Sequence, residues 1–132
     1  MTDTEKARQF FQADRFAVEA TGIEILEARQ GYAKCALKIE ARHRNAAGQV
    51  MGGVLFTMAD FAFAVAANLH QPTTVTQTSQ IVFLSAAKGD TLFAETECIR
   101  AGKRSCVYKI LVSDNTGRQL AYVTATGIVV GE

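Results

Sequence analysis

The segment from Gly48 to Leu69 constrains the fold more than any other part of the chain, because it is the longest apolar run and carries one charge, Asp60. Paired glycines, Gly52-Gly53, precede the stretch from Val54 to Leu69, which has neither Gly nor Pro and predicts a helix. Apolar residues lie on every side of this helix. We therefore expect it to be enclosed nearly all round, by membrane or by protein.

A membrane span is the first alternative for this run. About 18 residues is the lower limit for a span, and an aspartate near its middle costs roughly 2.5 to 3.5 kcal/mol. The run is therefore interpreted as a helix buried in a soluble domain, with no membrane partner. We expect the rest of the chain to supply a curved sheet that encloses it.

Length and charge restrict the function classes. The 132 residues fit one domain, 1–132, and 14 basic against 13 acidic residues give a net charge of +1, which argues against a general role on nucleic acid or a membrane surface. The odd number of cysteines, Cys35, Cys98 and Cys106, in strand-like patterns predicts buried thiols in a reducing compartment. The N-terminus is charged and lacks the apolar core of a signal peptide, so we expect a cytoplasmic location.

Turn signals divide the rest of the chain into one short helix and six strands. The segment Thr4–Phe16 mixes phenylalanines with charges, as in an outer amphipathic helix without a distinctive cap, and residues 40–50 form a loop before the long helix. The strands are expected at Ile23–Arg29, Tyr32–Ile39, Val75–Leu84, Thr91–Ala101, Arg104–Ser113 and Leu120–Val130. This order predicts an α+β fold with one long helix against an antiparallel sheet of about six strands.

The residues from Asn45 to Asp60 form the pattern N-x-x-G-x-x-M-G-G-x-x-x-x-x-x-D. This pattern resembles the central motif of hotdog-fold acyl-CoA thioesterases of the phenylacetate-degradation type, and the order of elements resembles that family over nearly the whole chain. The family usually has His immediately before the two glycines, where this chain has Met51. The resemblance implies hydrolysis of an acyl-CoA to free acid and coenzyme A, with no cofactor beyond the coenzyme A of the substrate.

Asp60 is the first candidate catalytic residue. A structural carboxylate that fixes helix packing is the alternative. A lone acid in so apolar a setting must find partners or raise its pKa from about 3.9, and a raised pKa suits a general base or a nucleophile. The sequence leaves those two roles open. By its spacing from Gly52, the family's catalytic carboxylate falls on Asp60.

Gly52 is the second candidate, because its N–H at the mouth of the helix can polarise a thioester carbonyl, an interaction worth roughly 3 to 4 kcal/mol in other hydrolases. Alternatively, the glycine pair only lets the helix pass close to a strand.

Gly52 and Asp60 are eight positions apart, or roughly 12 Å along the helix axis. If both act on one thioester, Asp60 comes from a second chain across a two-fold axis, with two sites per dimer. The resemblance implies the same homodimer, with the sheets joined edge to edge, and it leaves open whether two such dimers pair into a tetramer.

The resemblance also implies roles for residues outside the helix. The Asn45 amide would hold the Met51-Gly52 segment or the attacking water, and Thr76 would orient water or the acid. As an isolated loop Asn and an isolated strand Thr, both are more often structural. Residues expected to bind substrate lie at the helix mouth, on the following strand and at a basic turn: Met51, Gly53, Thr78, Phe83, Arg100, Gly102, Lys103, Arg104 and Ser105. The turn cations would meet the nucleotide phosphates, although such a tip is usually only solvated.

Two other functions are considered on the same fold. A non-catalytic acyl-CoA-binding module is kept open by Met51, although such sensors usually carry an output domain. A dehydratase or hydratase would pair an acid with a catalytic His near the helix, and no His occurs between His43 and His70. Neither histidine has ligand spacing with the cysteines, so no metal is expected. Phe56, Phe61 and Phe63 predict an apolar acyl pocket, with aryl and medium-chain groups both possible.

Overall fold

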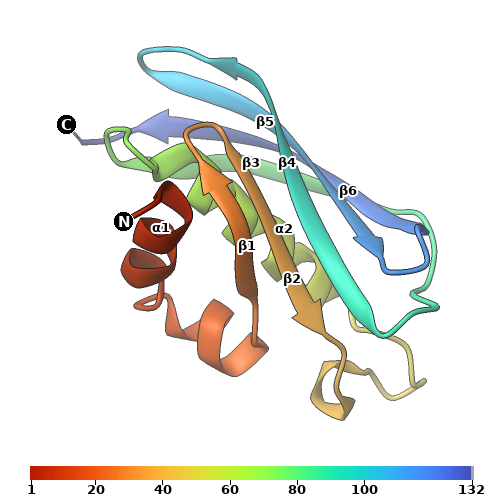
Figure 1. Ribbon diagram of the computed structural model, residues 1–132. Helices are drawn as coiled ribbons and strands as arrows, with labels where there is room; N and C mark the ends of the chain where they lie inside the picture. Colours follow the sequence, from red (N-terminus) through yellow and green to blue (C-terminus); the bar gives the residue numbers. More distant parts are fainter. Residues whose placement is uncertain (132) are drawn as a thin grey trace.

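One long helix lies against a six-stranded antiparallel sheet that curves around it in a hotdog fold, in a computed structural model that describes residues 1–131 (Figure 1). The helical elements are α1 (Asp3–Phe11), the π-helical turn η1 (Phe16–Thr21), the 3-10 turn η2 (Ala41–His43) and α2 (Gly52–Asn68). The strands are β1 (Glu24–Arg29), β2 (Tyr32–Lys38), β3 (Thr74–Phe83), β4 (Thr91–Ala101), β5 (Ser105–Asp114) and β6 (Gln119–Val129). The order across the sheet is β1-β2-β4-β5-β6-β3. The α+β prediction is confirmed, and each expected strand agrees within one residue at either end.

Helix α2 forms the centre of the core. Met58, Ala62 and Val65 are fully buried on its sheet-facing side, and the Phe63 ring packs edge to face on Tyr108 of β5 with the ring centroids 5.3 Å apart. Burial of such side chains against a sheet is the main favourable term in folding. Within residues 1–131, no helix is both long and apolar enough to span a membrane.

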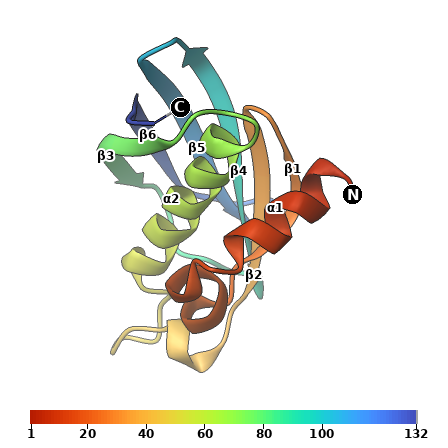
Figure 2. The same ribbon diagram turned by 90° about the vertical axis from the view of Figure 1, so that its left-hand side faces the viewer.

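The predicted enclosure of α2 on nearly all sides is wrong for the single chain. A stripe along the helix stays exposed or half-buried, at the three- and four-residue spacing of one helix face: Gly53, Phe56, Thr57, Asp60 and Ala64. The sheet curves behind the opposite face, and Figure 2 views the molecule from the side that the sheet does not cover. The α2 stripe, as we call these five residues, is therefore available to a second molecule.

The two edges of the sheet differ. On the β1 edge, Arg8 of α1 donates from Nε to the Ile25 carbonyl at 2.8 Å, and the Thr4 hydroxyl accepts from the Ala28 N–H at 3.1 Å. The β3 edge pairs with β6 on its inner side and with no strand of the described chain on its outer side. An open edge strand of this kind is a template for pairing with another chain.

The N-terminal helix is shorter than predicted. It ends at Phe11 rather than Phe16, and it begins with a capping box in which Thr2 and Glu5 bond each other's backbone N–H, so the expectation of no distinctive cap is also wrong. The chain then bends into η1, whose last carbonyls accept bonds from a distant loop: Arg42 Nη1 donates to Ala20 at 2.6 Å, and His43 Nε2 lies 2.7 Å from the Thr21 carbonyl. These tertiary bonds favour the bend over a continued helix.

One cysteine also departs from the prediction. Cys35 and Cys106 are buried, whereas Cys98 is exposed. The alternation of β4 stops after Thr96, and every later residue of that strand is exposed, because this end of the β4–β5 hairpin projects past the core (Figure 1). The exposure of both faces is confined to β4, because Cys106 and Tyr108 of the paired strand β5 remain buried.

Asp114, buried at the end of β5, holds two loops together. Its Oδ2 accepts from the N–H groups of Lys88 and Gly89 at 2.8 and 3.0 Å, and its Oδ1 accepts from the Thr116 hydroxyl at 2.6 Å. Burial by itself would raise the pKa of Asp114, but the hydrogen bonds from Thr116, Lys88 and Gly89 outweigh it and hold that pKa well below its usual range.

We expect Asp114→Ala to lower the free energy of unfolding by about 3 kcal/mol, because several part-buried donors lose a charged acceptor. Since the pKa is lower in the folded than in the unfolded state, this contribution is complete above about pH 4 to 5 and is lost as the pH falls further. Urea unfolding at neutral and acidic pH measures both effects. The difference between wild type and variant should shrink on acidification; a constant difference would contradict this account.

Candidate active site

Asp60 lies at the middle of the α2 stripe, next to the start of β3. The Thr76 hydroxyl of β3 donates to Asp60 Oδ1 at 3.4 Å, so the structure brings these two predicted site residues together. Burial among apolar neighbours raises the pKa of Asp60 above its ordinary value, the Thr76 bond opposes that rise, and the charge of Asp14 adds to it. A carboxylate with a raised pKa and access to solvent is suited to accept a proton or attack a carbonyl.

A depression of about 320 Å³ opens beside Asp60. One wall consists of Thr57, Phe61 and Ala64 of α2, and the other of residues 14–17, from the bend between α1 and η1. Sequence reasoning missed this second wall, because it assigned residues 14–16 to an outer helix. A signal for this wall in the sequence is the carboxylate Asp14 two positions before the aromatic Phe16.

Gly52 begins α2 at the other end of the predicted site. Met51, directly before it, is extended and gives no side-chain cap, and no hydrogen bond within residues 1–131 uses the N–H of Gly52 or Gly53. A Cβ at position 52 would lie 2.8 Å from Cζ of Phe83, so the exposed Phe83 ring packs close against this glycine. The helix mouth therefore offers free N–H donors beside a depression of about 230 Å³ that Gly52 and Phe83 line.

The Gly52 and Asp60 sites are separate within one chain. The two depressions share no residue, and they lie at opposite ends of β3, with Phe83 packed near Gly52 and Thr76 bonded to Asp60. The seven positions between Thr76 and Phe83 correspond to roughly 23 Å along a strand. One chain therefore does not present both groups to the same small reacting centre.

The Asn45 side chain forms hydrogen bonds within its own loop. Its Oδ1 accepts from the N–H groups of Ala47 and Gln49 at 3.0 and 3.1 Å, which is the turn-forming use of an Asn side chain. No hydrogen bond in the described chain joins Asn45 to Met51, Gly52 or Asp60. Met51 is held instead by its N–H, which donates to the His43 carbonyl at 2.9 Å, and its side chain is 57% exposed.

The remaining predicted substrate-binding residues lie on β3 and at the tip of the β4–β5 hairpin. The hydroxyl oxygens of Thr78 and Thr126 are 2.6 Å apart, so Thr78 bonds to the neighbouring strand. At the tip, the Gly102 N–H donates to the Ser105 carbonyl at 2.9 Å and closes the turn. Its cations are exposed, and none forms an ion pair within residues 1–131: Arg100, Lys103 and Arg104. They are free to meet an anionic ligand.

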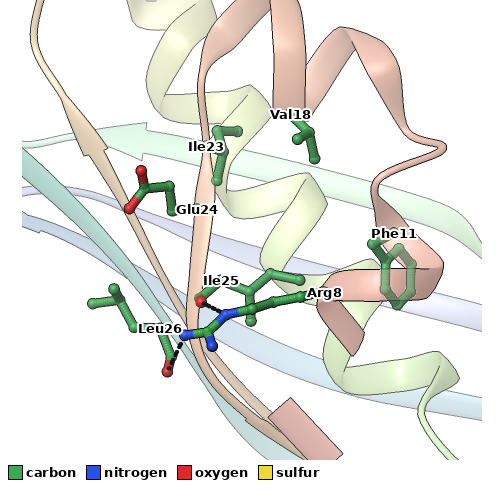
Figure 3. A pocket seen from close by; sticks show the side chains of 7 residues that line it. All are labelled: Arg8, Phe11, Val18, Ile23, Glu24, Ile25 and Leu26. Atoms are coloured by element: carbon green, nitrogen blue, oxygen red, sulfur yellow. Dashed lines mark hydrogen bonds between the residues drawn. The ribbon is translucent and has the colours of Figure 1, made fainter. Parts of the chain in front are cut away.

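A further apolar cavity of about 320 Å³ lies between α1, η1 and β1 (Figure 3). Phe11, Val18 and Ile23 supply its apolar walls, and Arg8 reaches across it to the carbonyls of Ile25 and Leu26, as the dashed lines show. It shares no residue with either depression at α2. The Arg8 contacts are part of the cover over the β1 edge.

The comparisons of this chain with a family model and with known proteins all indicate the same family. The model of the thioesterase superfamily matches residues 47–121, a span that includes Gly52, Asp60, Thr76 and the basic turn. A putative esterase from Archaeoglobus fulgidus is 30% identical over 97% of this chain and 84% of its own length. The acyl-coenzyme A thioesterase PaaI of Escherichia coli is 31% identical over 89% of this chain and 84% of that protein.

Comparison with solved structures indicates the same family. The structure of the E. coli PaaI protein has a TM-score of 0.87 at 29% identity, covering 98% of this chain and 97% of that chain. A hypothetical thioesterase from Streptococcus pneumoniae, solved with coenzyme A, has a TM-score of 0.84 at 27% identity over 92% of this chain and 98% of that chain. This chain belongs to the thioesterase superfamily and is a hotdog-fold thioester hydrolase of the phenylacetate-degradation type.

Proposed function

We propose that this protein hydrolyses an acyl-CoA thioester to the free acid and coenzyme A, with Asp60 as general base or nucleophile and the Gly52 N–H polarising the carbonyl. The observation that carries the proposal is the single carboxylate on the apolar α2 helix, bonded by Thr76 and open to solvent with a raised pKa. The names of the relatives support the substrate class.

Two routes fit this arrangement. As a general base, Asp60 takes a proton from water while the water oxygen attacks the thioester carbon, and the carbonyl oxygen becomes an oxyanion at the Gly52 N–H. As a nucleophile, Asp60 attacks that carbon and forms an anhydride, which water then hydrolyses. In both routes the C–S bond breaks and the coenzyme A sulfur leaves as a thiolate that takes up a proton. The Thr76 hydroxyl orients the carboxylate.

A homodimer with shared sites is part of the proposal. It is supported by the open β3 edge, the covered β1 edge and the exposed α2 stripe. Antiparallel pairing of two β3 strands about a two-fold axis would bring the two α2 helices alongside each other in opposite directions. Gly52 of one chain would then approach Asp60 of the other. Pairing of such dimers into a tetramer stays a prediction.

The first test is thiol release from a panel of aryl- and alkanoyl-CoA thioesters by the purified protein. Turnover of at least one member is expected, and the preferred member would identify the acyl group. Tight binding of acyl-CoA without thiol release from any member would contradict hydrolysis and favour a binding module, the reading that Met51 leaves open.

The basic turn is proposed to bind the nucleotide phosphates of coenzyme A. We expect Arg104→Glu, alone or with Lys103→Glu, to raise the half-saturation concentration for acyl-CoA much more than for an acyl thioester that lacks the nucleotide, because only acyl-CoA loses a Coulombic attraction. The measurement is steady-state thiol release with both substrates.

Lys6→Glu is the matched control, since it reverses an exposed charge on α1, away from the proposed site. It should change the half-saturation concentration for neither substrate. Equal effects of Arg104→Glu on the two substrates would mean that the turn is simply a solvated hairpin tip.

A further inference from the structure

The depression beside Asp60 holds a second carboxylate, Asp14. The backbone at Asp14 is fixed on both sides, since its N–H donates to the Phe11 carbonyl at 2.9 Å and its carbonyl accepts from the Val18 N–H at 2.9 Å. The bend between α1 and η1 therefore holds this side chain at the wall facing α2. No predicted role accounts for a carboxylate there.

The cation that lines this depression is paired with Glu19 rather than with Asp14 or Asp60. Arg15 also lines the depression, but its Nε lies 3.1 Å from each carboxylate oxygen of Glu19, and its Nη2 lies 3.0 Å from Glu19 Oε2. The other lining residues are uncharged. The charged groups facing Asp60 within the described chain are thus Asp14 and an Arg15 already paired with Glu19.

We propose that Asp14 is a specificity-determining residue, whose charge makes the site select uncharged acyl groups over acyl groups that end in a carboxylate. The inference rests on the proposed function, because it places the acyl group in the depression beside Asp60. A terminal carboxylate on the acyl chain would lie near two negative groups and be repelled. Uncharged acyl groups of the same length are not repelled, and they would contact the apolar side chains of Phe16, Phe61 and Ala64.

The same charge acts on Asp60 itself. Burial is the main cause of the raised pKa of Asp60, and Asp14 raises it further. Removing the Asp14 charge should lower the pKa of Asp60, so the ionised form persists to lower pH. The acid limb of the pH–rate profile would then shift toward lower pH. A residue that served only to support the fold would not produce this shift.

The test compares pentanoyl-CoA with glutaryl-CoA, which have equal acyl length and differ in the terminal carboxylate. At a pH on the plateau of the profile, Asp14→Asn is expected to raise the ratio of kcat/KM for glutaryl-CoA to that for pentanoyl-CoA by about fivefold or more. Asp14→Glu, which keeps the charge, should retain the wild-type ratio. Glu97→Gln, an acid-to-amide change at an exposed position of β4, is the matched control and should leave the ratio unchanged.

An unchanged ratio in folded, active Asp14→Asn would overturn the proposal while leaving the thioesterase assignment intact. Equal loss of discrimination in Asp14→Glu would also overturn it, because shape rather than charge would be responsible. If Asp14→Asn does not fold, Asp14→Ser gives the same comparison with a smaller side chain. Absence of thiol release from every acyl-CoA by the wild type would refute the proposed function itself, which is a different result.

Discussion

Asp60→Asn is expected to lower turnover by at least about a hundredfold while leaving the fold intact. The amide has the shape of the carboxylate but can neither accept a proton from water nor attack a thioester. Since burial raises the pKa of Asp60, the site disfavours the charged form, and a neutral amide should cost the fold nothing. Thiol release measures the first effect, and urea unfolding the second.

The control for this experiment is again Glu97→Gln, which changes an exposed carboxylate of β4 in the same way. It should retain both turnover and stability. Near-normal thiol release from folded Asp60→Asn would remove Asp60 from the reaction, whichever of the two routes is considered.

The strands and α2 could be predicted closely from sequence because their patterns are local. In β2, Cys35 and Leu37 face the core while Lys34 and Lys38 lie outside that layer, and a pattern with period two permits one register. The end of α2 was likewise visible, because Gln71-Pro72 stops a helix. In both cases the residues that determine the element lie within it or a few positions from its end.

The N-terminal segment was predicted less well because its conformation depends on distant partners. Its π-helical turn is bonded by Arg42 and His43, each more than twenty positions away from the carbonyls that they bind. No local pattern contains that information. The same error hid Asp14, since a residue placed on an outer helix would not line the depression beside Asp60.

The open face of α2 was missed for a different reason. Phe56 on the exposed stripe is as apolar as Phe61 and Phe63 on the buried sides. Hydrophobicity shows that a face avoids water, but it does not say whether the chain's own sheet or a second molecule covers it. The exposed Phe56 ring on the α2 stripe therefore favours a partner molecule on that face.

The shared site can be tested with two inactive variants, Asp60→Asn and Gly52→Pro. Proline removes the N–H at the helix mouth and is tolerated at the first helical position. Met51 before it already has ψ of 136°, the extended conformation that a residue before proline adopts. The added Cβ would contact the Phe83 ring, which is 56% exposed and free to move. Gly52→Ala adds the same Cβ but keeps the N–H, so it should lose far less turnover than Gly52→Pro.

When subunits of Asp60→Asn and Gly52→Pro exchange, a shared site predicts recovery of activity. In each mixed dimer one site would carry both lesions and the other neither, so about half of normal activity returns per mixed dimer, or about a quarter of normal over a random mixture. Sites built within one chain would each keep one lesion, and mixing would restore nothing. Both variants must first be folded and dimeric, and exchange must be shown by mass. With exchange demonstrated, a failure to recover thiol release would exclude the two-chain site.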